Sequence, residues 1–464
     1  MLWPSDRLKT DPTDRRLRKD DSSVTGGGLA DVTPSGISDA WSYKRRLLFS
    51  RELEMTNEET RCVIAGAGPG GAMLALLLAR RGVPVTLLEM HKDFDREFRG
   101  DTVHPSTLEI LDQLALAEKV HEIPHSKVYG PSFMTSKGLF QPFDLRRLKS
   151  KFPYILVVPQ AKFLELLTRE AAHYPEFRLK MGANVFDLIR ENGTVRGVRY
   201  QTSETQGEMR ALLTVGADGR HSRVRHLAAI EPVKTSPPMD VLWFKLPKLG
   251  GDKDAGSGLM GSFRGGRILV VLDRNDHWQV AFVFPKGQYQ QVRAAGLDAM
   301  KQAIVALEPS FAEHVQTLHD WQQLMLLSVE SSRCPRWHQP GLLLIGDAAH
   351  VMSPVGGVGI NYAIQDAVVA ANLLAKPLLE GRVDEQHLSE VQRQREHPTR
   401  FMQGLQAMMQ KRVLAPALTS TQATIQVPWL IRFLVQVPIL KDLPPRLIGF
   451  GLRRVRIDEN ALPR

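Results

Sequence analysis

The chain has 464 residues, of which 43% are hydrophobic and 24% charged, and these values exclude a fibrous or wholly disordered protein. Its two cysteines, Cys62 and Cys334, are too few for a disulfide framework and form no zinc-binding pair, so we expect a cytoplasmic protein without a bound metal. The net charge of +10 suits an anionic small molecule or membrane surface, but no nucleic-acid-binding motif accompanies it, so no nucleic acid partner is expected.

Residues 1–54 differ in composition from the rest of the chain. They are rich in Arg, Asp, Ser and Gly and show no sustained apolar period. Such a segment buries too little apolar surface to offset the entropy of ordering, so we predict a disordered extension. It is either a regulatory tail or an upstream extension, in which case Met55 begins the natural chain.

The first ordered elements are predicted to form a βαβ unit. An apolar run at residues 61–65 predicts a buried strand, and the leucine spacing over 70–81 predicts a helix that ends at Gly82. Residues 83–89 predict a second strand.

A glycine-rich turn at residues 66–71 joins the first strand to this helix. In a dinucleotide-binding turn, glycines allow a tight bend, close approach of the backbone to a pyrophosphate, and close helix–strand contact. The helix N-terminus presents free N–H groups to the phosphates, and an acid that ends the next strand binds ribose hydroxyls. These roles are predicted for Gly66, Gly68, Gly70, Gly71 and Glu89.

Helices are predicted at residues 105–120 and 160–172, and strands at residues 194–200, 211–215 and 342–345. Between residues 241 and 284, short apolar runs are separated by glycine-rich turns, which predicts antiparallel strands of a second domain. A long helix is predicted from Gly359, and the sequence after residue 383 is helical with interspersed prolines.

Two later motifs combine an acid with glycines. Asp218 lies in a turn after the strand at 211–215, and Asp347 follows the strand at 342–345. Such acids can bind polyol hydroxyls, and a glycine-rich loop that opens a helix directs backbone N–H groups at an anion. FAD extends well beyond its pyrophosphate and therefore needs a second binding site of this kind, so we predict that the cofactor is FAD. The loop residues assigned to this second site are Pro354, Gly357, Gly359 and Asn361.

Together and in this order, the three motifs resemble those of the para-hydroxybenzoate hydroxylase-like flavoprotein monooxygenases, which are FAD-dependent aromatic hydroxylases. The resemblance covers about residues 59–380. It implies an α/β fold, in which a Rossmann-like FAD-binding domain carries a mostly antiparallel β-sheet substrate domain and a helical C-terminal region. It also implies that Arg99 and Gln160 contact FAD near its phosphates or ribityl chain, that Asp347 binds a ribityl hydroxyl, and that Asp218 lies between cofactor and nicotinamide access.

The implied domain order interleaves the two domains along the chain. After the extension at 1–54, FAD-binding parts are expected at 55–128, 154–231 and 320–380, substrate-domain parts at 129–153 and 232–319, and a helical region at 381–464.

The implied activity is FAD-dependent monooxygenation. NADH or NADPH and O2 would be used to hydroxylate a small aromatic or lipophilic substrate through a flavin hydroperoxide. The sequence has no second dinucleotide fingerprint, so the nicotinamide would bind transiently, and Arg220, Arg223 and Arg225 are candidates for attracting its phosphates. Two alternatives stay open: an FAD-dependent reductase of isoprenoid-type double bonds, and a non-catalytic flavin-binding protein.

Few residues suggest further chemistry. His104 is a candidate for positioning substrate or flavin, and its alternative role is to cap the helix that begins at Pro105. Residues 425–452 are apolar but interrupted by prolines and arginines, and packing within the protein is favoured there over contact with a membrane surface. Five aromatic residues either line a substrate pocket or, as we expect for most, form sheet core: Trp243, Phe244, Phe263, Phe282 and Phe284.

Overall fold

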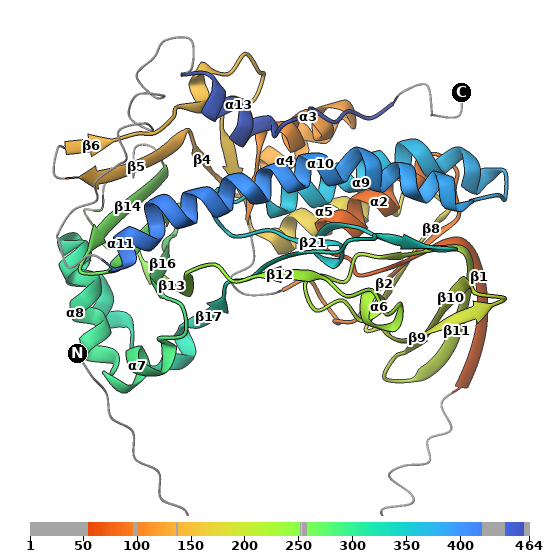
Figure 1. Ribbon diagram of the computed structural model, residues 1–464, viewed down its shortest axis with the longest axis horizontal. Coiled ribbons are helices and arrows are strands. Elements are labelled where there is room, and N and C mark those ends of the chain that lie inside the picture. The colour runs from red at the N-terminus through yellow and green to blue at the C-terminus, as the bar shows by residue number, and fades with distance from the viewer. Residues whose placement is uncertain are drawn as a thin grey trace, which may run out of the picture. The chain divides into compact units, whose positions relative to one another are not determined.

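The computed structural model describes residues 54–95, 101–135, 138–250, 252, 258–419 and 441–458 (Figure 1). The predicted extension at 1–54 lies outside the described residues except for Glu54, and Arg99 lies outside them entirely. Of the apolar segment at residues 425–452, residues 425–440 also lie outside the described residues.

An eight-stranded sheet, with the order β19-β20-β11-β1-β2-β8 and the β9–β10 hairpin beside β11, forms the first layer. Its strands are β1 (Glu54–Ala65), β2 (Val85–Glu89), β8 (Phe177–Met181), β9 (Asn184–Glu191), β10 (Thr194–Gln201), β11 (Thr205–Gly216), β19 (His338–Gln339) and β20 (Leu342–Leu344). β20, β11, β1, β2 and β8 run parallel. The carboxyl ends of β20, β11, β1 and β2 therefore lie at one edge of the sheet, which is where ligands bind in such folds.

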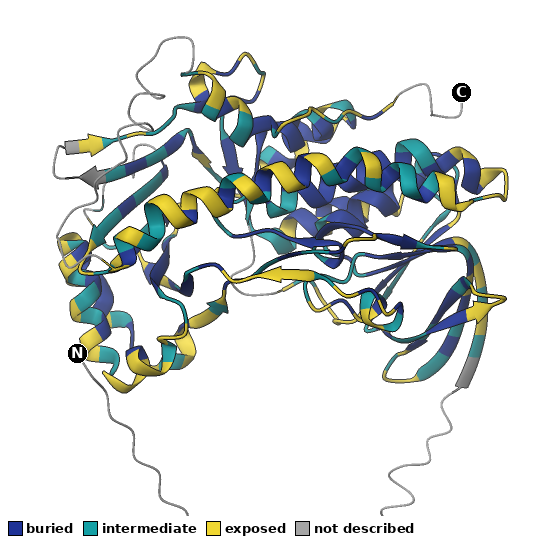
Figure 2. Ribbon diagram, in the orientation of Figure 1, coloured by how far each residue is buried: buried dark blue, intermediate teal, exposed yellow. Residues whose placement is uncertain are grey.

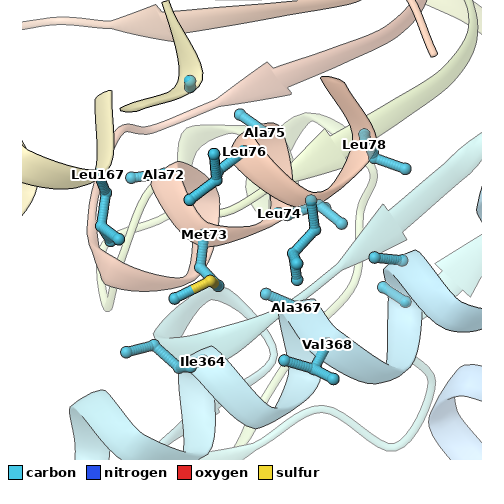
Figure 3. Close-up of a cluster of buried hydrophobic side chains, with 14 of the residues drawn as sticks. Ala72, Met73, Leu74, Ala75, Leu76, Leu78, Leu167, Ile364, Ala367 and Val368 are labelled. Carbon is cyan, nitrogen blue, oxygen red and sulfur yellow. The ribbon is translucent and has the colours of Figure 1, made fainter. Parts of the chain in front are cut away.

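Three helices stack against this sheet: α2 (Pro69–Ala79), α5 (Gln160–Ala171) and α9 (Gly359–Leu379). α2 is apolar on all sides and almost wholly buried, as a helix enclosed between other elements must be. In Figure 3 its Met73 and Leu74 face Ile364, Ala367 and Val368 of α9. Figure 2 shows the same two helices mostly buried, whereas α10 (Glu385–Met409), which runs beside α9, exposes its outer side. The helices predicted at 70–81, 160–172 and from Gly359 are confirmed.

The prediction of one continuous helix at 105–120 is wrong. The structure has two helices there, α3 (Pro105–Gln113) and α4 (Ala117–Glu122). Ala115 adopts a positive φ of 58°, a conformation that an α-helix cannot contain, and the chain changes direction at that residue.

A seven-stranded sheet, with the order β17-β13-β16-β15-β14-β5-β6, forms the second region. Its strands are β5 (Gly130–Thr135), β6 (Gly138–Phe140), β13 (Met239–Pro247), β14 (Gly258–Arg264), β15 (Arg267–Asp273), β16 (His277–Pro285) and β17 (Met325–Ser328). Every neighbouring pair is antiparallel except β14 with β5, so the mostly antiparallel sheet is confirmed. One face packs on α7 (Tyr289–Ala294) and α8 (Leu297–Leu307).

Short elements join the two regions. Two three-stranded sheets consist of β3 (Thr102–Val103), β7 (Ile155–Val157) and β4 (Ser126–Val128), and of β12 (Val233–Thr235), β18 (Ser331–Arg333) and β21 (His350–Val351). The remaining helices are α6 (Arg223–Leu227), α11 (Ala415–Thr419) and α13 (Leu443–Phe450), so the helical C-terminal region is confirmed for the described residues. None of the helices in the described ranges combines the length and hydropathy needed to cross a bilayer.

Candidate cofactor site

Backbone hydrogen bonds join the three predicted motifs into one site. The N–H of Gly66 donates to Leu88 at the end of β2 (2.7 Å), and that of Ala217 donates to Ala65 at the end of β1 (2.8 Å). The N–H of Ile345 donates to Gly216 at the end of β11 (3.0 Å). Turns that are distant in sequence are therefore adjacent along one sheet edge, as the motifs predicted.

The glycines of the first motif differ in what surrounds them. Gly66 has a φ of +100°, and a Cβ there would lie 2.6 Å from the carbonyl oxygen of Ala217. A Cβ on Gly71 would collide with the carbonyl of Gly66. A Cβ on Gly68, by contrast, would meet no protein atom within 4 Å. The first and third glycines thus fit tightly against protein, and the second borders open space, as a pyrophosphate-binding turn requires.

Gly70 occupies a different environment. A Cβ on it would lie 3.1 Å from the carbonyl oxygen of Ala363 in α9. Its lack of a side chain is therefore explained by the contact between α2 and α9, which brings the first turns of the two helices together. Neither helix carries a capping side chain or an acidic residue in its first turn. Two uncapped, neighbouring N-termini concentrate positive potential at the sheet edge, which suits an anionic ligand.

Glu89 organises the glycine turn from the end of β2. Its side chain is buried, and its carboxylate accepts hydrogen bonds from the N–H of Ala67 (2.9 Å) and of His91 (3.0 Å). A carboxylate has about four lone-pair sites, so accepting two N–H groups does not by itself prevent contact with a hydroxyl group. The geometry agrees with the predicted ribose contact.

Asp218 has protein partners on both carboxylate oxygens. Ser222 donates its hydroxyl to one oxygen (2.5 Å), and the N–H of Val224 donates to the other (3.0 Å). Burial raises the pKa of Asp218. Its side chain therefore shapes the turn into α6.

The arginines of the second motif also differ in role. The Arg225 guanidinium donates to the carbonyl oxygens of Ala348 (3.0 Å) and Arg220 (2.8 Å), which ties the second motif to the third. These bonds occupy it within the protein, whereas the Arg223 side chain is exposed.

The loop before α9 is fastened to β3 and α3. A Cβ on Gly357 would lie 2.6 Å from the Thr102 hydroxyl oxygen, and that hydroxyl donates to the Gly357 carbonyl (2.8 Å). The buried amide of Asn361 accepts hydrogen bonds from the N–H of His104 and the hydroxyl of Thr107, both at 2.8 Å. The Asn361 side chain, whose amide N–H group also donates to the Thr102 carbonyl (3.2 Å), thus holds the loop in place. The half-buried Pro354 closes the loop by accepting a hydrogen bond from Gly357 (3.0 Å).

His104 is buried and occupies the N-cap position of α3, as the capping interpretation expected, but its side chain makes no capping hydrogen bond. The imidazole Nδ1 lies 2.7 Å from the backbone carbonyl oxygen of Ile448 in α13. Burial lowers the pKa of His104 to about 4, so the ring is neutral near pH 7. Its side chain therefore connects α13 to the start of α3, and its backbone N–H connects the start of α3 to Asn361 of α9.

A buried ion pair joins the two sheet regions beside Gln160. The Arg274 guanidinium, after β15, lies 3.2 Å from the Asp101 carboxylate, which also accepts the N–H of Gln160 at the start of α5 (3.3 Å). Burial raises the pKa of Asp101. Sequence patterns gave no indication of Arg274, because its partner is distant in sequence.

Strand register separates the five aromatic candidates onto two faces of the second sheet. Three of them belong to the core shared with α8, as expected for most: Phe244, Phe282 and Phe284. Trp243 and Phe263 are half-buried on the opposite face, where Trp243 pairs with Ala281 of β16, and Ala281 with Val270 of β15. Val355 of the loop before α9 packs on this same face. That face therefore meets the part of the first region that carries the third motif.

The residues present fit FAD. The open space at Gly68, the two uncapped helix N-termini and the buried acid Glu89 lie along one sheet edge, and Asp347 follows the adjacent strand in a half-buried position. Within the described ranges no group of His, Cys, Asp and Glu side chains could hold a metal ion.

Comparisons with known proteins agree with this geometry. A family described as an FAD binding domain matches residues 59–404. The chain is 34% identical over 401 residues to a 6-methylpretetramide 4-monooxygenase from Streptomyces rimosus, covering 85% of this chain and 93% of that protein. It is 32% identical over 320 residues to a 12-dehydrotetracycline 5-monooxygenase/anhydrotetracycline 6-monooxygenase of the same species, covering 66% of this chain and 60% of that relative.

Solved structures show the same fold. The OxyS anhydrotetracycline hydroxylase from Streptomyces rimosus superimposes with a TM-score of 0.67 at 25% identity, covering 84% of this chain and 76% of that one. PqsL from Pseudomonas aeruginosa superimposes with a TM-score of 0.66 at 19% identity, covering 78% and 97%. The two sequence relatives are monooxygenases, which favours that activity over the reductase and non-catalytic alternatives. The chain therefore belongs to the FAD-binding-domain family and is an FAD-dependent monooxygenase.

Proposed function

We propose that this enzyme uses NADH or NADPH and O2 to hydroxylate an aromatic substrate of the fused-ring polyketide type. The observation that carries the proposal is the convergence of the turns after β1, β11 and β20 at one sheet edge, opposite the Trp243 face of the second sheet. The names of the similar Streptomyces monooxygenases support this substrate class.

In the proposed complex, Gly66, Gly68 and Gly71 shape the pyrophosphate turn, and Glu89 accepts the adenosine ribose hydroxyls. Asp347 accepts a ribityl hydroxyl, and Gln160 and Arg99 contact the phosphate or ribityl region. The N-terminus of α9 stabilises negative charge on the ring system through its N–H groups. Pro354, Gly357, Gly359 and Asn361 act through the backbone and shape of their loop, because the Asn361 side chain is occupied within the protein.

Bound FAD supplies the redox and oxygen-activating chemistry, and the protein binds, orients and excludes water. The aromatic substrate lies on the face formed by Trp243, Ala281 and Val270, where apolar side chains exclude water from the reacting atoms. His104 is neutral and buried, so its proposed role is to hold the loop beside the flavin rather than to move a proton.

The nicotinamide cosubstrate binds transiently in this proposal. Of the three arginines considered, Arg223 is exposed and suits its phosphates, whereas Arg225 is committed to the third motif. We also propose that the FAD-binding domain comprises residues 55–128, 154–231 and 320–380, and the substrate domain residues 129–153 and 232–319. We also propose a cytoplasmic location, which two buried, unpaired cysteines support.

Anaerobic reduction followed by exposure to oxygen tests the function. The purified holoenzyme is reduced with NADPH or NADH, then mixed with O2 and a fused-ring polyphenol. We expect faster flavin reduction with substrate present and a product that carries one oxygen atom from O2, detected by mass spectrometry with labelled oxygen. Reoxidation with peroxide as the sole oxygen product across a panel of such polyphenols would contradict the substrate class. Saturation of a substrate double bond would restore the reductase alternative.

A further inference from the structure

We propose that three buried side chains behind the cofactor site, Asp366, His350 and Arg395, act as positioning residues for Asp347. The inference rests on the proposed cofactor role of Asp347 and goes beyond it, because none of these three residues belongs to the predicted site.

Asp366 binds both ends of the turn that carries Asp347. This residue of α9 is fully buried, and one carboxylate oxygen accepts the N–H of Gly346 (3.0 Å) and the ring Nε2 of His350 (2.6 Å). Gly346 immediately precedes Asp347, and His350 follows it by three residues. A single side chain therefore sets where this turn begins and ends relative to α9.

The turn has little freedom to shift on its own. Gly346 has a φ of +58°, and a Cβ there would lie 3.0 Å from the Cβ of Ala363 in α9. The Ala348 carbonyl is bonded to Arg225, and the Ala349 carbonyl accepts the N–H of Cys334 (2.8 Å). A displacement of the Gly346 end would therefore rotate Asp347 rather than move the whole turn.

Arg395 of α10 holds the Asp366 carboxylate from the other side. Its Nε donates to the second carboxylate oxygen at 2.7 Å, and its guanidinium carbon lies 5.4 Å from the centre of the Tyr362 ring. Burial alone would raise the pKa of Asp366, but its interactions with His350 and Arg395 hold that pKa below its ordinary value. The carboxylate thus remains an ionised, multiple acceptor inside the protein.

His350 is fixed in turn by aromatic packing. Its ring lies 4.8 Å from the Trp337 ring, centre to centre, and Trp337 is fully buried. The chain of contacts runs from α10 through Asp366 to the turn, with each group packed and almost inaccessible to water. Asp347 at its end is only half-buried, as a ligand-facing residue would be.

Simple stabilisation of the α9–α10 contact is the competing explanation, and the two make different predictions. Replacing a buried ion pair by apolar side chains of similar volume is often neutral or stabilising, whereas removing one partner leaves an uncompensated charge. The double variant Asp366→Leu/Arg395→Met leaves no uncompensated charge in this pair, so it should lose less apoprotein stability than the single variant Asp366→Leu. It nonetheless loses the acceptor for Gly346 and His350, so a positioning role predicts weaker FAD binding.

The experiment measures the FAD dissociation constant by fluorescence quenching, the visible circular dichroism of the bound flavin, and the Tm of the apoprotein. We expect the double variant to raise the FAD dissociation constant about 10- to 100-fold, as loss of a residue that orients a metal ligand weakens metal binding, and to change the dichroism. The single variant Arg395→Lys keeps the positive charge and a hydrogen-bond donor beside Asp366, so it should retain most of the FAD affinity of the wild-type protein. Unchanged FAD affinity and dichroism in the double variant would overturn the inference.

Asp366→Asn serves if the double variant does not fold, because it keeps the volume and one acceptor oxygen. It should weaken FAD binding in the same direction, and wild-type affinity in it would also overturn the inference. Arg81→Met is the matched control: Arg81 is a buried arginine that donates to Asn372 of α9 at 2.7 Å, away from the third motif. It should change Tm without changing the dichroism.

Asp347→Ala separates failure of this inference from failure of the proposed function. If Asp347→Ala leaves FAD binding unchanged, the assigned cofactor role of Asp347 is wrong. If it weakens binding while the Asp366 and Arg395 variants do not, only the positioning role is wrong. If the cofactor role of Asp347 and the positioning role of Asp366 are both correct, the two substitutions act through one contact. Combining Asp347→Ala with Asp366→Asn should then reduce the free energy of FAD binding by less than the sum of the two single reductions.

Discussion

The two sheet regions differ in where their functional residues lie. In the parallel sheet, function lies in the turns after the strands, where glycines such as Gly66 and Gly71 pack against backbone atoms with no room for a side chain. In the antiparallel sheet, each strand contributes both core residues and residues that face the first region, because alternate residues point to opposite faces. Phe244 is enclosed under α8, whereas its neighbour Trp243 is half-buried toward the first region.

This difference explains which parts of the enzyme tolerate change. A turn whose backbone approaches other backbone cannot accept even a methyl group without distortion. A sheet face toward a ligand can exchange one apolar side chain for another and alter what it binds. We infer that cofactor binding constrains the first region residue by residue, and that substrate preference resides in one face of the second.

The largest expected effect compares the two faces of the second sheet. Phe282→Ala removes a fully buried ring and should lower the free energy of unfolding by about 4 kcal/mol. Trp243→Ala should cost clearly less stability but raise the KM for the aromatic substrate. Chemical denaturation and steady-state kinetics measure both. If the two variants were equally destabilised and Trp243→Ala left KM unchanged, the division into a core face and a substrate-binding face would be wrong.

The next effect compares two glycines of one turn. Gly71→Ala places a methyl group against the Gly66 carbonyl and should cost about 3 kcal/mol of stability. Gly68→Ala meets no protein atom within 4 Å and should fold normally, yet bind FAD more weakly because the methyl group enters the pyrophosphate space. Thermal unfolding of the apoprotein and FAD titration check the pair. Normal FAD affinity in Gly68→Ala would contradict the placement of the pyrophosphate.

A smaller effect concerns the junction of the two regions, where His104 lies. Its folded-state pKa of about 4 is below the ordinary value of 6.5, so the unfolded chain binds a proton first as the pH falls. The stability that this group contributes is fully present above pH 6.5 and is lost as the pH falls toward 4. Between pH 7 and pH 5 the loss is about 2 kcal/mol.

His104→Gln should reduce this pH dependence, because glutamine does not titrate. Denaturant unfolding of the apoprotein at several pH values measures the slope in both proteins. An identical slope in the variant would assign the pH dependence to other groups.

The smallest effect is expected at the cysteines of the first region. Burial raises the pKa of Cys62, and it raises the pKa of Cys334 to about 11, so neither is a thiolate near neutral pH. Alkylating reagents should leave the native enzyme unmodified and fully active, and should react with both residues after unfolding. Mass spectrometry of intact protein checks this. Rapid modification of the native enzyme would contradict the packing around β1 or the third motif.

Local patterns were sufficient for much of the fold and of the cofactor site. The spacing of Gly66, Gly68 and Gly71 between a strand and a helix depends on neighbouring residues alone, and the structure contains that turn. The same holds for the apolar strand before Asp347 and for the long helix after Gly357. The break at Ala115 was missed, because the apolar period continues through it and only its left-handed backbone separates α3 from α4.

The sequence by itself determined the parallel sheet, its glycine turns and the order of the three motifs, since each arises from short-range periodicity and turn chemistry. The tertiary structure alone decided that the Asn361 amide fastens its loop, that Arg225 joins two motifs, and that Phe244 rather than Trp243 faces α8. It also decided the burial of Asp366 with Arg395, residues on two different helices. Polar partners and sheet faces depend on which distant segments come together, and that information is absent from any local pattern.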